Sequence, residues 1–146
     1  MKTSASSRRG SFREIEHTAD LGIEVTAADL PALFALAGEA VFSLIVDPQT
    51  VESREISAVS ATGSCPEDLL HAWLRELLAR FNIDSFVARS CEITRLDPGQ
   101  IDGIITGETL DLSRHTFHTE IKGVTYHDFK VWQEDGAWHA RIIFDV

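Results

Sequence analysis

The sequence predicts an α+β fold: a single domain in which two amphipathic helices pack on a mainly antiparallel β-sheet that ends in a C-terminal β-hairpin. Two segments, at 29–46 and from residue 64 to about 82, carry apolar residues at the three-and-four spacing of one helical face. The segments around them alternate apolar and polar residues or are rich in β-branched residues, and turn residues separate them. A chain of 146 residues has the size of one domain and can bury a substantial core.

The first third of the chain predicts a tail, a strand pair and a helix. Residues 1–11 are polar and basic and lack the apolar stretch of a signal peptide, so they are predicted to form a flexible basic tail, and residues 12–146 the folded domain. From Phe12 onward, two strands flank a tight connection at 17–22, and the second strand resumes at Ile23. Asp29 is a suitable N-cap for the helix 29–46, which Asp47-Pro48 ends, and residues 51–61 read as a strand.

The middle of the chain predicts a second helix and a hairpin. The Ser-x-x-Glu spacing of Ser64 and Glu67 is typical of a capping box. A wide apolar stripe follows, and the helix is expected to end near Asn82. Strands at 86–96 and 101–112 are predicted to form a hairpin around the turn residues 97–99. The stripe, interpreted as core, comprises Leu69, Leu70, Trp73, Leu74, Leu77, Leu78 and Phe81.

Asp135-Gly136 predicts a type I′ turn between strands at 125–134 and 137–146. If Glu134 pairs with Ala137, counting outward places Tyr126 opposite Asp145, with Lys122 on the same face. Trp132 then faces away from the core, within reach of His139. The residues predicted to share the core face are Phe129, Val131, Trp138, Ala140, Ile142 and Phe144, and those predicted to share the other face are Tyr126, Asp128, Lys130, Arg141 and Asp145.

Charge and motif content exclude several classes of function. The chain has 13 Lys and Arg against 23 Asp and Glu, a formal charge of −10, and this argues against strong direct binding of nucleic acid. It contains no apolar run that could span a bilayer, no phosphate-binding loop and no common hydrolase motif. Two cysteines, Cys65 and Cys91, without a Cys-x-x-Cys pair favour a cytoplasmic protein over a disulfide framework.

A few polar residues remain as candidates for chemistry. Asp20, Asp145 and the free carboxylate of Val146 would form a hard-oxygen site for calcium, magnesium or manganese if the fold joins them. The alternative is that Asp20 bonds local backbone N–H groups and the C-terminal carboxylates are solvated. Lys122 could form a salt bridge, or contact a phosphate or a partner.

The histidines leave two interpretations open. His115 and His118 are three residues apart but have no third ligand at a zinc-site spacing, so a structural role bonding backbone is favoured. His71 and His139 are also interpreted as structural. His17 and His127 adjoin the candidate segments, and we expect them to orient neighbouring carboxylates.

Three segments resemble the archease family in order, spacing and position: residues 17–23 (HTADLGI), 121–127 (IKGVTYH) and 144–146 (FDV). The resemblance covers the chain from Phe12 onward. Gly123 departs from it, because the family more often has Ala there. By this resemblance a divalent cation is held by Asp20, Asp145 and Val146, and Lys122 is a functional lysine. Tyr126, which the hairpin count places on the face of Asp145, is expected to join His17 and His127 around the site.

The resemblance also implies a role without catalysis of its own. Archeases are accessory proteins that act with the GTP-dependent RtcB-type RNA ligase of tRNA splicing and RNA repair, and promote its guanylylation and multiple turnover. They have also been linked to a tRNA cytosine methyltransferase as a chaperone-like partner. Two other functions stay open from the residues: a stand-alone metal-dependent phosphoesterase, and a chaperone-like binding module with a structural cation.

Overall fold

The computed structural model describes residues 10–17 and 20–146, with the backbone alone for residues 16, 17 and 20. All strand pairings are antiparallel. One sheet has the order β1-β2-β8-β6, with β7 also paired to β8, and the other has the order β3-β5-β4. The elements are β1 (Gly10–His17), β2 (Asp20–Ala27), α1 (Leu30–Ile45), the 3₁₀ turn η1 (Pro48–Thr50), β3 (Glu55–Thr62), α2 (Pro66–Asp84), β4 (Phe86–Asp97), β5 (Gln100–Thr109), β6 (Gly123–Val124), β7 (Lys130–Glu134) and β8 (Ala137–Asp145).

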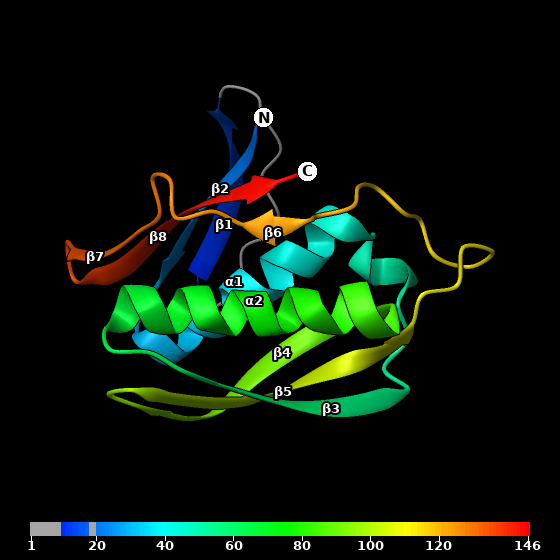
Figure 1. Ribbon diagram of the computed structural model, residues 1–146, viewed down its shortest axis with the longest axis horizontal. Coiled ribbons are helices and arrows are strands. Elements are labelled where there is room, and N and C mark those ends of the chain that lie inside the picture. The colour runs from blue at the N-terminus through cyan, green and yellow to red at the C-terminus, as the bar shows by residue number, and fades with distance from the viewer. Residues whose placement is uncertain (1–9, 18–19) are drawn as a thin grey trace.

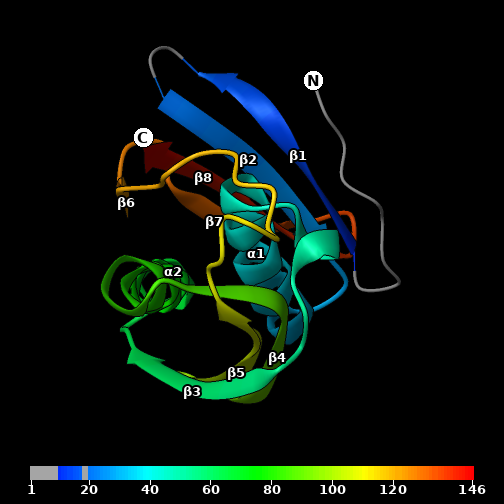
Figure 2. The same ribbon diagram turned by 90° about the vertical axis from the view of Figure 1, so that its right-hand side faces the viewer.

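The two helices lie between the two sheets, as Figures 1 and 2 show from perpendicular directions. This confirms the predicted α+β fold of two helices packed on antiparallel β-structure, which forms two sheets where the sequence predicted one. The inward faces of both sheets and the helices share one apolar core. None of the helices in the described part of the chain is long and apolar enough to cross a membrane.

Helix α1 is buried on nearly all sides because it lies in the middle layer. It begins as predicted after Asp29, whose carboxylate accepts a hydrogen bond from the N–H of Ala32 at 2.9 Å. On α2, Trp73 is fully buried and its indole N–H donates to the main-chain oxygen of Phe34 at 3.1 Å. The predicted apolar stripe of α2 is therefore core, and Trp73 ties the two helices together.

The predicted capping box at the start of α2 is wrong. The N-cap is Cys65, which makes no side-chain cap, and the hydroxyl of Ser64 instead donates to Asp68 at 2.5 Å. Because the helix starts one residue later than predicted, Glu67 is not at the position that reaches back to the cap. Its carboxylate accepts from the N–H of Val131 at 3.0 Å and so connects α2 to β7. The helix also runs to Asp84, two residues beyond the predicted end.

The C-terminal hairpin has the predicted register near its turn. Glu134 pairs with Ala137 and Val131 with Ala140, and both turn residues have positive φ, 54° for Asp135 and 76° for Gly136. The residues of β7 and β8 near the turn also divide between the two faces as predicted: Ala140, Ile142 and Phe144 are buried in the core, while Lys130 and Arg141 are exposed.

The prediction that Tyr126 lies opposite Asp145 is wrong. Gly123 takes that place, since β6 pairs with β8 three residues out of register with β7. The cause is a turn between β6 and β7 in which the N–H of Phe129 bonds to the oxygen of Tyr126 at 3.3 Å and Asp128 adopts φ 53°. This turn takes up three residues that a continuous strand would have placed in the ladder.

Several predicted boundaries move. Gly10 and Ser11 were predicted to belong to the tail but pair with Ala27 and Thr26, so the domain begins at residue 10 within the described chain. The rest of the predicted tail, residues 1–9, lies outside the described residues. β3 begins at Glu55 rather than at residue 51, and β5 ends at Thr109 rather than at 112.

Two glycines test how tightly the middle layer is packed. A methyl group on Gly103 would lie 2.6 Å from Cη2 of Trp73 and 2.7 Å from the main-chain oxygen of Glu92, whereas one on Gly123 meets nothing within 4 Å. Gly103→Ala should lower the free energy of unfolding by ~1–3 kcal/mol, the range for overpacked cores. Gly123→Ala should change it by less than about 0.5 kcal/mol. Urea unfolding of both variants checks this, and equal effects would contradict the packing argument.

Candidate functional site

The segments singled out in the sequence converge at one end of the five-stranded sheet. Leu21 of β2 pairs with Phe144 of β8, so the next positions along this ladder are Asp20 and Asp145. Asp20 also pairs with His17 across the connection between β1 and β2. The side chains of His17 and Asp20 lie outside the described residues, so the convergence of Asp20 with Asp145 is a statement about the backbone.

The segment before β6 joins the same place. The backbone N–H of Lys122 donates to the main-chain oxygen of Asp145 at 2.8 Å, and Gly123 pairs with Asp145. Figures 1 and 2 show β6 running along the C-terminal end of β8. Ile121 is fully buried and anchors this segment, whereas Lys122 and Asp145 are exposed and Val146 is half exposed. We call Asp20, Lys122, Asp145 and Val146 the acidic corner.

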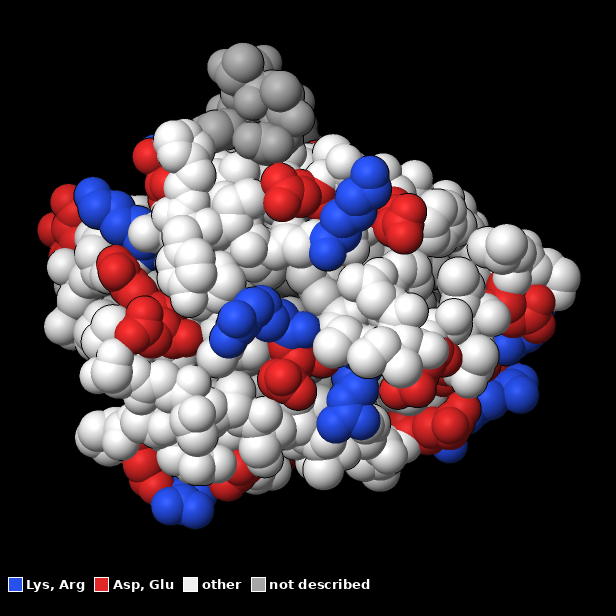
Figure 3. Space-filling view, in the orientation of Figure 1, with Lys and Arg blue, Asp and Glu red and all other residues white. Residues whose placement is uncertain are grey.

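Among the residues whose side chains are described, no group of three or more His, Cys, Asp or Glu is placed to hold a metal. The described part of the acidic corner supplies the carboxylate of Asp145, the main-chain oxygens of Val146 and the ammonium of Lys122. These oxygens are hard donors of the kind that calcium, magnesium and manganese prefer. Over the face that Figure 3 presents, acidic and basic side chains are interspersed and do not form one large patch of either sign.

The chain after Lys122 rests on α2 through an aromatic stack. The exposed ring of Tyr126 lies parallel to the buried ring of His71, with centroids 3.7 Å apart and an interplanar angle of 6°. Phe129 meets the same histidine edge-on at 5.2 Å. Together with the bond from Val131 to Glu67, these contacts hold both ends of the loop between β6 and β7. Tyr126 therefore supports the loop that follows β6, while Lys122 lies immediately before β6.

His71 acts in this stack as a neutral ring. Neither of its ring nitrogens has a hydrogen-bond partner in the described structure. Burial lowers the pKa of His71, and the nearby guanidinium of Arg75 lowers it further. The predicted structural role of this histidine agrees with its position. His127, predicted to orient the carboxylates of the corner, is exposed, and its Nε2 lies 3.5 Å from a carboxylate oxygen of Asp128.

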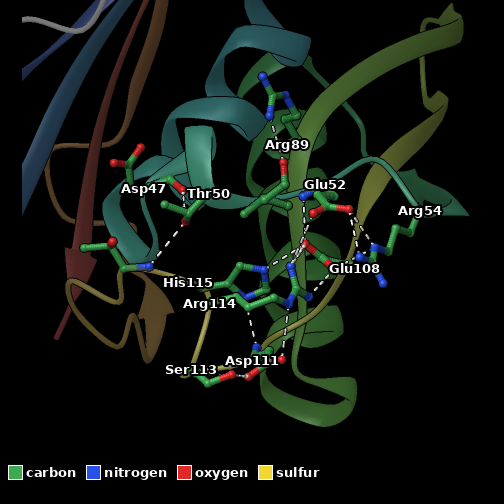
Figure 4. Close-up of polar contacts among 12 residues, drawn as sticks. Asp47, Thr50, Glu52, Arg54, Arg89, Glu108, Asp111, Ser113, Arg114 and His115 are labelled. Atoms are coloured by element: carbon green, nitrogen blue, oxygen red, sulfur yellow. Dashed lines mark hydrogen bonds and ion pairs between the residues drawn. The ribbon is translucent and has the colours of Figure 1, made fainter.

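A second polar cluster lies at the C-terminal end of β5, in the three-stranded sheet. Figure 4 shows Glu108 at its centre. One carboxylate oxygen accepts from Nη2 of Arg114 at 2.6 Å. The other accepts from the N–H of Glu52 at 2.7 Å and lies 2.8 Å from Nε2 of His115. Arg54 lies 3.5 Å away as a further cation. We call Glu108, Arg114 and His115 the Glu108 cluster.

These contacts keep Glu108 ionised although its side chain is only 3% exposed. The hydrogen bond from Arg114 is the largest cause, and it lowers the pKa of Glu108 to about 2 against the effect of burial. The N–H of Asp111 donates to Nδ1 of His115 at 2.9 Å, so Nε2 is the nitrogen that carries the proton toward Glu108. Both nitrogens of His115 are occupied, so this cluster ties loops together and has no group left to move a proton.

The contacts of His115 and His118 favour the structural interpretation of these histidines over a zinc site. His115 bonds backbone and a carboxylate, as the structural alternative to a zinc site predicts. His118 is exposed, and its backbone N–H bonds to the oxygen of Ile45 at 2.7 Å. The only signal in the sequence for the cluster is an acidic residue at the end of an otherwise apolar strand, and that does not reveal which cations will meet it.

Comparisons with known proteins find one family. The family model described as Archease protein family (MTH1598/TM1083) matches residues 12–146. Protein archease of Methanopyrus kandleri is 40% identical over 138 residues, which cover 92% of this chain and 99% of the relative. Protein archease of Pyrococcus abyssi is 36% identical over 139 residues, 92% of this chain and 98% of the relative.

Solved structures agree with these relatives. The solution structure of protein 1598 from Methanobacterium thermoautotrophicum has a TM-score of 0.76 at 32% identity, covering 92% of this chain and 98% of the other. The crystal structure of an archease from Thermotoga maritima, described as a possible chaperone, has a TM-score of 0.66 at 18% identity, covering 92% and 96%. The second likeness shows the fold alone.

The Glu108 cluster predicts a pH-dependent stability. Since folding lowers the pKa of Glu108 from 4.5 to about 2, its contribution is complete above pH 4.5 and is lost as the pH falls toward 2. At pH 7 Glu108→Gln should reduce the free energy of unfolding by ~3 kcal/mol, as expected when one member of a buried ion pair is removed.

Urea unfolding of the wild type and Glu108→Gln across this pH range checks the prediction. The difference between them should shrink as the pH falls below 4.5. Glu55→Gln, at an exposed acid that lines the same surface pocket as Glu108, is the matched control and should change stability little. A difference that stays constant with pH would show that the ionised form of Glu108 is not what stabilises the fold.

Proposed function

Because the chain belongs to the archease family, we propose that it activates a GTP-dependent RNA ligase of the RtcB type in tRNA splicing or RNA repair. It does so as an accessory protein without catalysis of its own, in the cytoplasm, and its contribution is made at the acidic corner. A divalent cation held there by Asp20, Asp145 and Val146 is the cofactor of this activation, and calcium, magnesium and manganese are the candidates.

The observation that carries the proposal is the convergence of three distant segments. The pairing of Leu21 with Phe144 aligns Asp20 with Asp145, and the 2.8 Å bond from Lys122 to Asp145 adds the third segment. Lys122 has its backbone fixed in the sheet and its side chain exposed. Because the backbone of Lys122 is held in place, its ammonium group is positioned for contact with a group outside the protein.

The residues fit a cation that is shared with phosphate. Carboxylate and main-chain oxygens suit hard divalent ions, which also bind nucleotide phosphates. The bound cation would supply charge neutralisation at the phosphates of the ligase nucleotide. Lys122, on the same corner, would offset the negative charge that develops on those phosphates. The carboxylates of Asp20 and Asp145 would orient the ammonium group of Lys122.

A second candidate is a chaperone-like role toward a tRNA cytosine methyltransferase. It is favoured by the description of the Thermotoga maritima structure as a possible chaperone. This role would change the solubility of the methyltransferase and leave the guanylylation of the ligase unaffected. A stand-alone phosphoesterase would instead hydrolyse a phosphoester without any partner.

Removing a carboxylate from the corner should abolish activation without unfolding the domain. Asp145→Asn should weaken cation binding, measured by calorimetry, at least about tenfold, equivalent to ~1.4 kcal/mol. Guanylylation and multiple-turnover RNA ligation by the ligase with GTP should fall to the level without this protein. Asp145 is exposed, so the melting temperature should change little. Asp20→Asn should act in the same way.

Asp135→Asn is the matched control. It also converts an exposed Asp of the C-terminal hairpin to an amide, and Asn tolerates the positive φ of that turn. It should leave cation binding and activation intact. Full activation by Asp145→Asn would overturn the proposal, and phosphoester hydrolysis by the purified wild type alone would favour the phosphoesterase.

Association with the ligase should weaken as salt is added. A chain with a formal charge of −10 is expected to meet a basic enzyme surface, and ions screen such attraction. The dissociation constant of the complex, measured by fluorescence anisotropy, should therefore rise steadily from low to physiological ionic strength. A constant value over that range would exclude an electrostatic interface.

A further inference from the structure

The outward face of the five-stranded sheet carries a basic and aromatic surface on an acidic protein. The strand registers align its side chains in rows across β7, β8, β2 and β1. One row is Lys130, Arg141, Glu24 and Arg13, and the next is Trp132, His139, Thr26 and Ser11. We call these two rows the sheet-face patch.

The first row is a fixed array of cations. Arg141 donates to Glu24 at 2.8 Å, and Arg13 forms an ion pair with the same carboxylate from the other side. Although burial acts to raise it, the hydrogen bonds and charges of the two guanidiniums lower the pKa of Glu24, which stays ionised. With Lys130 the row has three cations and one anion, whereas the whole chain has a formal charge of −10.

The guanidiniums remain accessible, since the side chains of Arg13 and Arg141 are 50% and 44% exposed.

The second row is a pair of oriented rings. Trp132 and His139 stack with centroids 5.2 Å apart and an interplanar angle of 16°, which confirms the predicted contact. Nδ1 of His139 lies 3.1 Å from the hydroxyl of Thr26, and the indole N–H of Trp132 donates to Glu134 at 3.1 Å. Nζ of Lys130 lies 5.6 Å from the tryptophan ring. The rings are thus held in place while both residues stay partly exposed.

This combination fits single-stranded nucleic acid. Bases of a single strand stack on aromatic and guanidinium groups, and their phosphates pair with neighbouring cations, as on other open sheets that bind RNA. In a duplex the base faces are already stacked and cannot use the rings. The net charge keeps such binding weak when the protein is alone.

The patch and the acidic corner lie on one strand. His139, Arg141, Ile143 and Asp145 alternate along β8 on the same side of the sheet, and Ile143, which separates the patch from the corner, is fully buried. At ~3.3 Å per residue, the six steps from His139 to Asp145 span roughly 20 Å. We propose that single-stranded RNA docks on the two rows of the sheet-face patch, with its end directed past Ile143 toward the acidic corner and the ligase. This rests on the proposed function and adds the substrate strand to it.

Direct binding tests the patch without the ligase. The probe is a short fluorescein-labelled single-stranded RNA added to the full chain at low salt, with fluorescence anisotropy as the readout. Trp132→Ala and Lys130→Gln should each weaken binding at least about fivefold. Lys130→Gln should also flatten the plot of log Kd against log salt by about 0.7, the value for one lost phosphate contact on a single strand. The same RNA as a duplex should bind more weakly.

The matched control is Arg95→Gln, which removes an exposed arginine, paired with Asp97, from a strand of the other sheet. It should leave binding and its salt slope unchanged. Lys130 is exposed, so Lys130→Gln keeps the test valid if Trp132→Ala lowers the melting temperature. Equal binding by Lys130→Gln and the wild type, or equal losses in Lys130→Gln and Arg95→Gln, would overturn the proposal.

Ligase assays separate this inference from the proposed function. Lys130→Gln should raise the KM for RNA in multiple-turnover ligation and leave guanylylation in the absence of RNA unchanged. Asp145→Asn should abolish guanylylation itself. If Lys130→Gln also abolishes guanylylation, the patch contacts the ligase and the RNA proposal is overturned. If Asp145→Asn is fully active while Lys130→Gln loses RNA binding, the patch stands and the proposed function fails.

Discussion

Strands β2 and β8 come from opposite ends of the chain and pair continuously from Leu21 with Phe144 to Ala27 with Trp138. This pairing places the start of β2 beside the end of β8, and it gives β6 the strand on which Lys122 is anchored. It also builds the rows of the outward face. Because alternate residues of a strand point to opposite faces, the same two strands hold core side chains inward and the sheet-face patch outward.

The middle layer makes this arrangement rigid. The helices fill the space between two sheets, and small residues allow the close approach: an added methyl group on Gly38 would lie 2.8 Å from Leu77, and one on Gly103 2.6 Å from Trp73. The Glu108 cluster and the ion pairs of Glu24 both lie outside this layer. The Glu108 cluster joins loops around the end of β5, and Glu24 joins the guanidiniums of two strands, so both carboxylates hold neighbouring segments in place.

Local chemistry explains which predictions hold. Asp29 caps α1 by accepting a hydrogen bond from Ala32, three residues further on. Asp135-Gly136 determines the register of the two strands that it joins. Both predictions hold because each depends on residues close together in the sequence. Ser64 and Glu67 have the spacing of a capping box, yet Glu67 bonds to Val131 and the helix starts one residue later. A partner 64 residues away competes with the local bond, and spacing alone does not reveal it.

Periodicity, turn residues and composition determined by themselves the α+β class, the two helices, the hairpin and the acidic balance of this protein, since each arises from neighbours along the chain. The three segments of the acidic corner were also recognisable as motifs. Only the tertiary structure decided that Gly123 rather than Tyr126 faces Asp145, that Glu108 gathers Arg114 and His115, and that Arg13 joins Arg141 on one face. These contacts depend on sheet order and on a turn that shifts the register by three residues, and both are settled when the whole core packs.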